Sequence, residues 1–331
     1  MIHELPLVFR VASLATVLTV LAIDLLLVRR RPHVPTTREC VIGVAIYVTL
    51  ALGFAGLLLA VGGSAPAGEF LAGWLTEYSL SVDNLFVFLL IMSSFAVPRE
   101  QQQRVLMVGI LLALVLRAAF ILAGAAVIDR FTWVFYLFGA FLVFTAVQLL
   151  RSGDVRDDEY RENLVVRMAR RVLPIAPGYD GGNVRTVVDG RRMLTPLLVV
   201  FVAIGTTDVL FAFDSIPAIF GLTHDPFIVF TANVFALMGL RQLYFLVGGL
   251  LDRIVYLSAG LAAVLAFIGL KLVLEALATN SVPFINAGRP VTWAPSLPTW
   301  LSLVVIVVAL GTATAASLVH TRRRAPDVTA P

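Results

Sequence analysis

Residues 76–84 read Thr-Glu-Tyr-Ser-Leu-Ser-Val-Asp-Asn and place two carboxylates, Glu77 and Asp83, six positions apart in an apolar region. A second pair has the same spacing: Asp208 and Asp214, in the stretch Thr-Asp-Val-Leu-Phe-Ala-Phe-Asp-Ser at 207–215. Ionisable side chains in hydrocarbon are costly and usually mark the path of an ion or substrate. The repeated pair predicts one site built from two related halves of the chain.

The composition predicts a membrane protein. Hydrophobic residues make up 59% of the chain, charged residues 14%, and the mean hydropathy is +0.93. Apolar segments of about 20 residues are long enough to cross a bilayer as helices. We expect an all-α polytopic fold of about nine transmembrane helices, at 7–28, 40–61, 70–95, 105–128, 132–150, 194–220, 226–250, 254–277 and 299–320.

The distribution of arginine predicts the orientation. The connections on one side collect most of the arginines, and basic loops mark the cytoplasmic side of a membrane. With nine spans, the N-terminus is expected outside and the C-terminus in the cytoplasm. The high pI of about 9.6 is therefore explained by arginines in loops beside the lipid bilayer, and we expect no nucleic-acid partner. The first segment reads as a retained helix, because Arg29, Arg30 and Arg31 follow it where a signal peptide would have small residues.

The similarity of the halves extends beyond the acids. A largely apolar stretch that ends in arginine follows each acid pair: residues 109–117 end at Arg117, and residues 233–241 end at Arg241. Each unit has three helices, and an odd number inverts the second unit, as in many secondary transporters. The predicted organisation is two N-terminal helices at 1–68, the first repeat at 69–150, an arginine-rich cytoplasmic loop at 151–193, the second repeat at 194–278, and an outer loop, last helix and tail at 279–331.

The four acids need positive charge if they are buried. Arg117 and Arg241 are available as supporting or gating charges, which leaves two formal negative charges if all four acids are ionised. Buried excess charge is either protonated or matched by a cation. One divalent ion matches it directly, while two protons or two sodium ions also serve. The alternative is structural, with acids and arginines only holding the bundle together.

The six-residue spacing predicts breaks in the third and sixth spans. On an unbroken helix, residues six apart lie about 120° around the axis and do not share a face. Pro217 and Gly205 are candidate break points in the sixth span, and Ser79 and Ser81 lie between the acids of the third. Unwound segments would also expose carbonyl oxygens to a cation.

The candidate ligands all bind through oxygen. They are Glu77, Asp83, Asn84, Asp208, Asp214 and Ser215, with Asn233 as a further neutral donor. Such sites suit Mn²⁺, Mg²⁺ and Ca²⁺ better than Zn²⁺ or Cu⁺. His224 and Asp225, in the next outer loop, either receive a released ion or only form a solvated turn. No nucleotide-binding loop or hydrolase motif is present, so we expect neither an enzyme nor a prosthetic group.

Three strings carry a resemblance: residues 77–84, 213–219 and 225–236 resemble the TerC/Alx family of integral membrane proteins. The similarity extends over about residues 40–280. It implies a bacterial inner-membrane protein related to LysE-type transporters, manganese efflux, and an association with tellurite resistance. Matched by position, the acidic and amide residues that the resemblance implies for the site are the same six ligand candidates. The family pattern also implies a glutamate three positions before Asp208, where this chain has Gly205.

The leading hypothesis is a Mn²⁺ exporter coupled to inward proton movement. A Ca²⁺ or other cation/proton exchanger is the second hypothesis. The third is a membrane scaffold of a stress-response complex, with structural acids and with partners bound through the 151–193 loop. That loop otherwise reads as a linker with a short helix ending before Pro174.

Overall fold

A computed structural model describes residues 5–324 apart from 31–34, 132, 152–163, 189, 248–255, 279, 281, 283–284, 287–288, 292 and 296. Most of this part is helical. The helices are α1 (Leu7–Arg30), α2 (Thr37–Gly62), α3 (Ser64–Ser94), α4 (Arg99–Arg130), α5 (Val134–Arg151), α6 (Leu164–Val172), α7 (Pro196–Phe220), α8 (Pro226–Met238), α9 (Leu240–Val247), α10 (Leu257–Ala278) and α11 (Thr299–Arg324).

The chain is a multi-pass integral membrane protein. In the described part, eight helical segments are long and apolar enough to cross a bilayer, and they match eight of the nine predicted spans. The remaining predicted span, at 70–95, corresponds to α3, which has 31 residues and carries the first acid pair. At about 1.5 Å per residue, α3 exceeds the bilayer's hydrocarbon thickness of about 30 Å. The all-α polytopic prediction is therefore confirmed.

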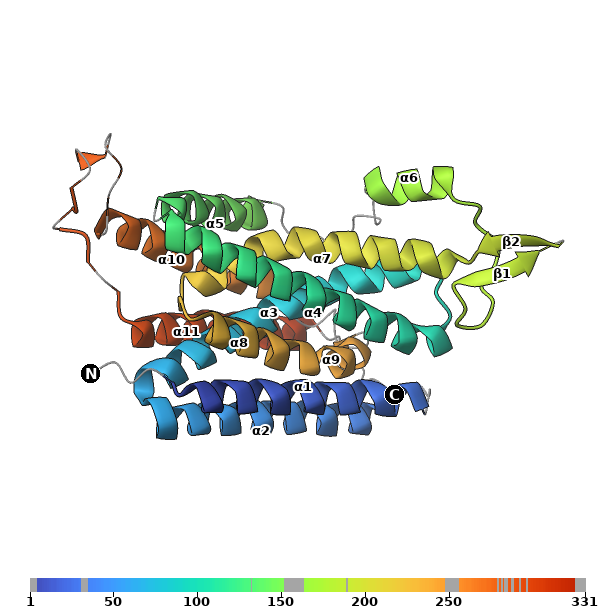
Figure 1. Ribbon diagram of the computed structural model, residues 1–331, viewed down its shortest axis with the longest axis horizontal. Helices are drawn as coiled ribbons and strands as arrows, with labels where there is room; N and C mark the ends of the chain where they lie inside the picture. The colour runs from blue at the N-terminus through green and yellow to red at the C-terminus, as the bar shows by residue number, and fades with distance from the viewer. Residues whose placement is uncertain are drawn as a thin grey trace.

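The helices form one bundle in which helices of the first half pack against helices of the second (Figure 1). Helix α5 packs on α10, α3 packs on α8, and α4 packs on α7. In Figure 1, α3 begins at the left, where α2 ends, whereas α7 begins at the right, after β2. This pairing agrees with two halves of opposite direction, while the symmetry relation itself stays a prediction.

The tightest contact between the halves joins α5 and α10. A Cβ placed on Gly139 would lie 2.7 Å from the carbonyl oxygen of Gly269, and one on Gly269 would lie 2.8 Å from that of Gly139. Only glycine permits this approach, because the neighbouring atom is backbone and cannot rotate away. Small residues at such crossings are typical of helix packing in membranes.

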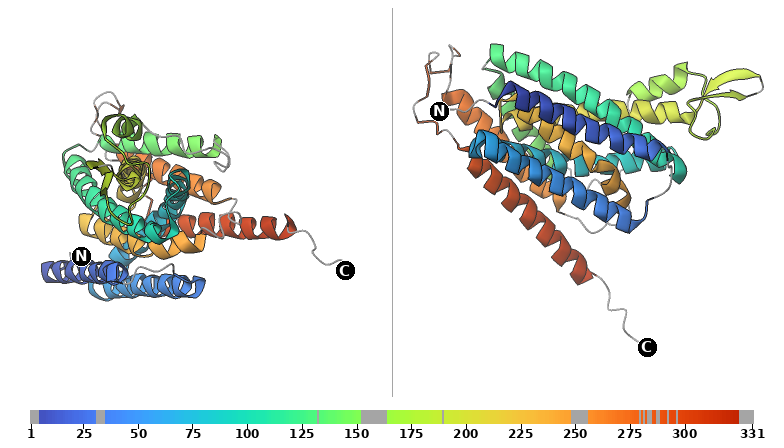
Figure 2. Two further views of the ribbon diagram at one scale, coloured as in Figure 1. Left: turned by 90° about the vertical axis from the view of Figure 1, so that its right-hand side faces the viewer. Right: turned by 60° about the horizontal axis from the view of Figure 1, so that its bottom comes forward.

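Three helices form the periphery of the bundle. Helices α1 and α2 both lie on the same side of the bundle, and α11 runs obliquely away from the other helices (Figures 1 and 2). Their apolar side chains are largely exposed in the protein alone, as Leu7, Val8 and Trp300 illustrate. By contrast, α8 is buried along almost its whole length. The core is therefore built from α3, α4, α7, α8 and α10, with lipid as the natural solvent of the periphery.

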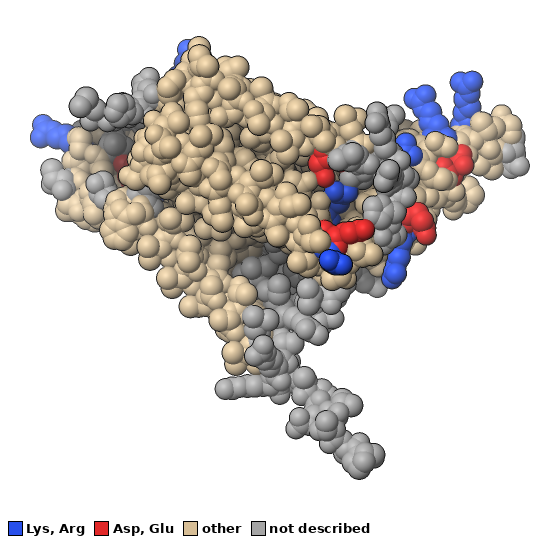
Figure 3. Space-filling view, turned by 90° about the horizontal axis from the view of Figure 1, so that it is seen from below, with Lys and Arg blue, Asp and Glu red and all other residues tan. Residues whose placement is uncertain are grey.

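The segment between the halves contains a short helix and a β-hairpin at one end of the bundle (Figure 1). As predicted, the helix, α6, ends before Pro174. The hairpin, β1 (Arg185–Val188) with β2 (Arg191–Leu194), was not predicted. Its signal was the sequence Asp-Gly at 189–190, a common two-residue hairpin turn, and Gly190 has a φ of 76°. Several basic side chains gather at this end, beyond a middle region of few charges (Figure 3).

The predicted breaks in the third and sixth spans are wrong. Helices α3 and α7 are continuous, and Pro217 lies in the last turn of α7. The hydroxyl of Ser79 donates to the carbonyl of Leu75, 2.7 Å away, so it supports the helix and does not replace a lost bond. The interruption is instead at Gly239, where α8 ends and α9 begins.

Candidate functional site

The centre of the candidate site is a buried arginine on α4. Arg117 is 2% exposed. Its Nη1 donates to Glu77 Oε2 of α3 and, at 2.6 Å, to Asn233 Oδ1 of α8. Its Nη2 lies 3.9 Å from Asp208 Oδ1 of α7. Arg117 thus joins carboxylates from both halves of the chain.

These groups occupy the middle of their helices. Asp208 is the central residue of α7, and Glu77 and Arg117 lie within about one turn of the centres of α3 and α4. In helices that cross a membrane, these positions correspond to the region of the bilayer midplane. A charged network at that depth is costly unless its members are paired, and is a functional-site hypothesis by default.

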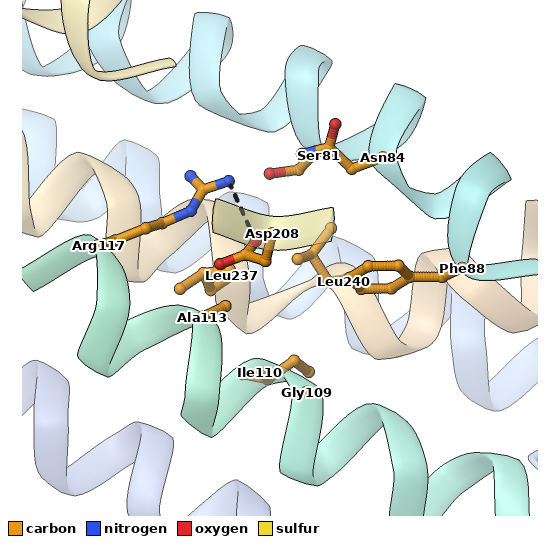
Figure 4. Close-up of a pocket in the computed structure, with 10 residues that line it drawn as sticks. All are labelled: Ser81, Asn84, Phe88, Gly109, Ile110, Ala113, Arg117, Asp208, Leu237 and Leu240. Atoms are coloured by element: carbon orange, nitrogen blue, oxygen red, sulfur yellow. Dashed lines mark ion pairs between the residues drawn. The ribbon is translucent and has the colours of Figure 1, made fainter. Parts of the chain in front are cut away.

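One face of α3 lines the site. Glu77, Ser81, Asn84 and Phe88 follow one another at spacings of four, three and four residues, which places them along one stripe of an α-helix. Ser81 and Asn84 are buried, and with Phe88 they line a small cavity (Figure 4). This stripe was the signal by which Ser81 could have been identified as a site residue; the six-residue pairing of the acids obscured it.

The cavity lies between four transmembrane elements and the start of α9. Its lining comprises Ser81, Asn84, Phe88, Gly109, Ile110, Ala113, Arg117, Asp208, Leu237 and Leu240 (Figure 4). It has room for about one water-sized ligand. Its polar lining residues are Ser81, Asn84, Arg117 and Asp208, and the remaining residues, among them Phe88, Ile110 and Leu240, make the rest of the lining apolar.

Apolar clusters lie on both sides of the polar stripe. Phe70 and Trp74 precede Glu77 on α3 and belong to one cluster. Leu85 and Phe88 accompany Asn84 and belong to the other. The charged groups are therefore screened from water along the helix axis in both directions, and their interactions are stronger than in solvent.

Several polar atoms around the cavity have no hydrogen-bond partner. They include Glu77 Oε1, Asp208 Oδ2, Ser81 Oγ, Asn233 Nδ2 and Arg117 Nε. Buried polar atoms are normally paired, and an orphan group calls for an explanation. Three of these five atoms are oxygens able to bind a cation, so the donor set fits a small hard cation in chemical type.

Only part of the predicted ligand set can be placed. Glu77, Asn84, Asp208 and Asn233 are buried and lie around Arg117 or the cavity. Ser215 is buried with an unpartnered Oγ but does not line the cavity. The side chains of Asp83 and Asp214 lie outside the described residues. Among the residues described, no group of three or more His, Cys, Asp or Glu side chains forms a metal cluster.

Arg241 has a different partner from the one expected. Its Nη2 lies 2.9 Å from Asp24 Oδ1 of α1, and both side chains are largely buried. Arg241 is thus paired with an acid that the sequence analysis overlooked, although Asp24 lies inside the first predicted span. Arg241 therefore does not neutralise the described acids Glu77 and Asp208, for which Arg117 is the described arginine partner.

A second polar group links α3 to the loop before α8. Thr223 Oγ1 donates to Glu69 Oε2 at 2.6 Å, and Asp225 pairs with Arg10 at 2.9 Å. Asp225 also caps α8, accepting from the backbone NH of Phe227. Asp225 thus belongs to the turn before α8, where it is paired with Arg10 and is not simply solvated. Glu69 was missed because the predicted span began one residue after it.

Gly205 faces α4. A Cβ at this position would lie 2.5 Å from Leu112 Cδ2, so a larger residue requires that leucine to move. The glutamate that the family resemblance implies here would therefore require at least a new position for the end of the Leu112 side chain. Gly205 is one turn from Asp208, and because it carries no carboxylate, Asp208 is the acid among the described residues that line the cavity.

Comparison with known proteins gives the family. The model of the integral membrane protein TerC family matches residues 62–325. The chain is 50% identical over 311 residues to the uncharacterized membrane protein Rv2723 of Mycobacterium tuberculosis, covering 93% of this chain and 78% of the relative. It is 42% identical over 263 residues to the putative membrane-bound redox modulator Alx of Escherichia coli K12, covering 77% and 82%.

A further relative is the uncharacterized membrane protein STKORF319 of Myxococcus xanthus, 42% identical over 309 residues, with 93% of this chain and 91% of the relative covered. No solved structure matches the chain. The family match spans both acidic helices, and the predicted resemblance is confirmed. The chain belongs to the integral membrane protein TerC family.

Proposed function

We propose that this protein exports a divalent metal cation, with Mn²⁺ as the principal substrate, across the bacterial plasma membrane. The carboxylates at the centre of the bundle form the binding site, and inward proton movement through the same groups supplies the energy. The arginine-rich end of the bundle, with α6 and the hairpin, faces the cytoplasm, in accordance with the positive-inside rule.

The meeting of Glu77 and Asp208 carries the proposal. These acids come from different halves, lie near mid-membrane, and contact the same arginine. A buried oxygen without a hydrogen-bond partner remains on each of them, and Asp208 lines a cavity together with Ser81 and Asn84. In a purely structural network, buried oxygens of this kind would normally be paired.

The type of donor supports Mn²⁺. Carboxylate, amide and hydroxyl oxygens suit Mn²⁺, Mg²⁺ and Ca²⁺, and no His or Cys lines the described cavity. Asp83 and Asp214 belong to the same two helices and complete the proposed set with Ser215. The placement of their side chains is part of the proposal.

The redox role in the name of the relative Alx finds little support in this sequence. The chain has a single cysteine, Cys40, which is buried in α2. One cysteine cannot form a disulfide within the chain. A transporter accounts for the charged midplane, whereas a dithiol mechanism has no residues to act through.

Transport by the purified protein tests the proposal. Proteoliposomes would be loaded with a Mn²⁺-quenched fluorophore, and uptake measured under an imposed proton gradient, with Ca²⁺ and Mg²⁺ as competitors. We expect Mn²⁺ uptake by the wild type, its loss in Asp208→Asn, and normal uptake in Glu100→Gln, whose carboxylate is exposed in the first turn of α4. Absence of Mn²⁺ movement under every gradient would reject the proposal, and preferential Ca²⁺ movement would favour the exchanger hypothesis.

A further inference from the structure

Arg117 is bound to oxygen atoms that a transported cation would need as ligands. Its guanidinium holds Glu77 Oε2 and Asn233 Oδ1 by hydrogen bonds and lies near Asp208 Oδ1. A guanidinium stays protonated in proteins, so it cannot make room by losing its charge. A divalent ion bound between these acids would face a fixed positive charge at close range, and the two cations would exclude each other.

We propose that Arg117 is an internal cation that exchanges with the transported ion. In one step of the cycle the guanidinium neutralises Glu77 and Asp208; in the other the metal ion takes its place and Arg117 withdraws. This inference rests on the proposed function and adds the means by which the site is emptied. The returning guanidinium displaces the metal and restores neutrality.

The arrangement of the free oxygens gives the ion a point of entry. Glu77 Oε1, Asp208 Oδ2 and Ser81 Oγ have no partner, so they are available while Arg117 still holds the opposite oxygens of the two acids. An ion in the cavity meets Asp208 and Ser81, which line it, and then Glu77, which is held by the same guanidinium. Its binding then weakens the hold of each carboxylate on the guanidinium, because the negative charge is shared.

Arg117 is also held in a manner that permits withdrawal. All its described hydrogen bonds are made by Nη1, and Nε has no partner. The side chain is therefore fixed at its tip. Ala113, one turn earlier on α4, is small and lines the same cavity. Because the stem is long and has several rotatable bonds, loss of the tip contacts removes every described hydrogen bond that holds this rotamer.

The exchange has an electrostatic advantage. Two ionised acids left in a low-dielectric interior without a cation are strongly unfavourable, because they lose their hydration and gain no compensating charge. A site that releases its metal must therefore be protonated or receive another cation. Arg117 provides that cation without a second solute and keeps the empty site from admitting small ions at random.

Binding and transport by Arg117 variants test the inference. Mn²⁺ binding to the purified protein would be measured by the loss of the free-ion electron paramagnetic resonance signal, and Mn²⁺ transport in proteoliposomes. For Arg117→Gln we expect affinity to rise by about tenfold or more and transport to fall by about tenfold or more. Arg130→Gln is the control, because it removes an exposed arginine from the end of the same helix.

Arg117→Lys keeps the test decisive if Arg117→Gln does not fold. Lysine retains the charge but lacks the fork that contacts three side chains at once, so we expect a smaller increase in Mn²⁺ affinity. If the wild type binds Mn²⁺ and the folded variants bind it equally or more weakly, the inference is overturned while the proposed function stands. If neither the wild type nor the variants bind Mn²⁺, both are overturned.

Discussion

Arg117 Nη2 and Asp208 Oδ1 lie 3.9 Å apart across the interface between α4 and α7. This contact joins the first half of the chain to the second at the middle of the membrane. Glu77, from the same half as Arg117, contacts the other terminal nitrogen of the guanidinium, Nη1. The site therefore exists only when the two halves are assembled.

Removal of Glu77 should destabilise the protein strongly. Glu77→Ala leaves Arg117 buried without its closest partner, and breaking a buried pair from one side costs about 3–5 kcal/mol. We expect a clear fall in the midpoint of thermal unfolding in detergent. The double variant Glu77→Gln, Arg117→Gln removes both charges and should recover part of the loss. Equal stability of Glu77→Ala and the wild type would show that the pair is not formed in the native protein.

Ser81 should contribute to cation binding, whereas Ser79 should not. Ser81 Oγ is unpartnered at the cavity, while Ser79 Oγ is bonded to the backbone of its own helix. We expect Ser81→Ala to weaken Mn²⁺ binding roughly tenfold, or about 1.4 kcal/mol, with little change in thermal stability. Ser79→Ala is the matched control, two residues away on α3. A similar affinity for both variants would remove Ser81 from the ligand set.

The Asp24–Arg241 pair should matter for stability and not for the substrate. Asp24→Asn and Arg241→Gln each break a largely buried pair between α1 and α9. Thermal unfolding of the single and double variants should give a coupling energy of about 0.5–3 kcal/mol. Mn²⁺ affinity should stay at the wild-type value in all three. A rise in affinity for Arg241→Gln comparable to that expected for Arg117→Gln would place Arg241 in the central site after all.

The glycine contact between α5 and α10 should not tolerate a methyl group. Gly139→Ala would place Cβ against a backbone oxygen, and overpacking of this kind costs about 1–3 kcal/mol. We expect a lower unfolding temperature and a smaller monodisperse fraction in size-exclusion chromatography. Gly53→Ala is the control, because no atom lies within 4 Å of the added Cβ. Equal behaviour of the two variants would contradict the close approach.

Local sequence signals predicted the helices but only part of their interior. Hydropathy located the spans because burial in lipid depends on composition over about 20 residues. The pairing of acids by spacing was less informative, since Glu77 and Asp208 meet through Arg117 while each helix continues unbroken. Which acid faces which arginine is decided by tertiary packing. Asp24 could have been recognised within its span, yet its pairing with Arg241, 217 residues away, has no sequence signal.

The backbone contact at Gly139 and Gly269 has a mechanical consequence. A methyl group on either glycine would already meet the opposite carbonyl oxygen, so the two helices have little room to slide along each other at this point. Helices α5 and α10 therefore form a fixed point between the two halves. If the proposed transport moves one half against the other, this contact favours a rotation about the crossing, with displacement growing toward α3, α4, α7 and α8, the helices that carry Arg117 and its partners.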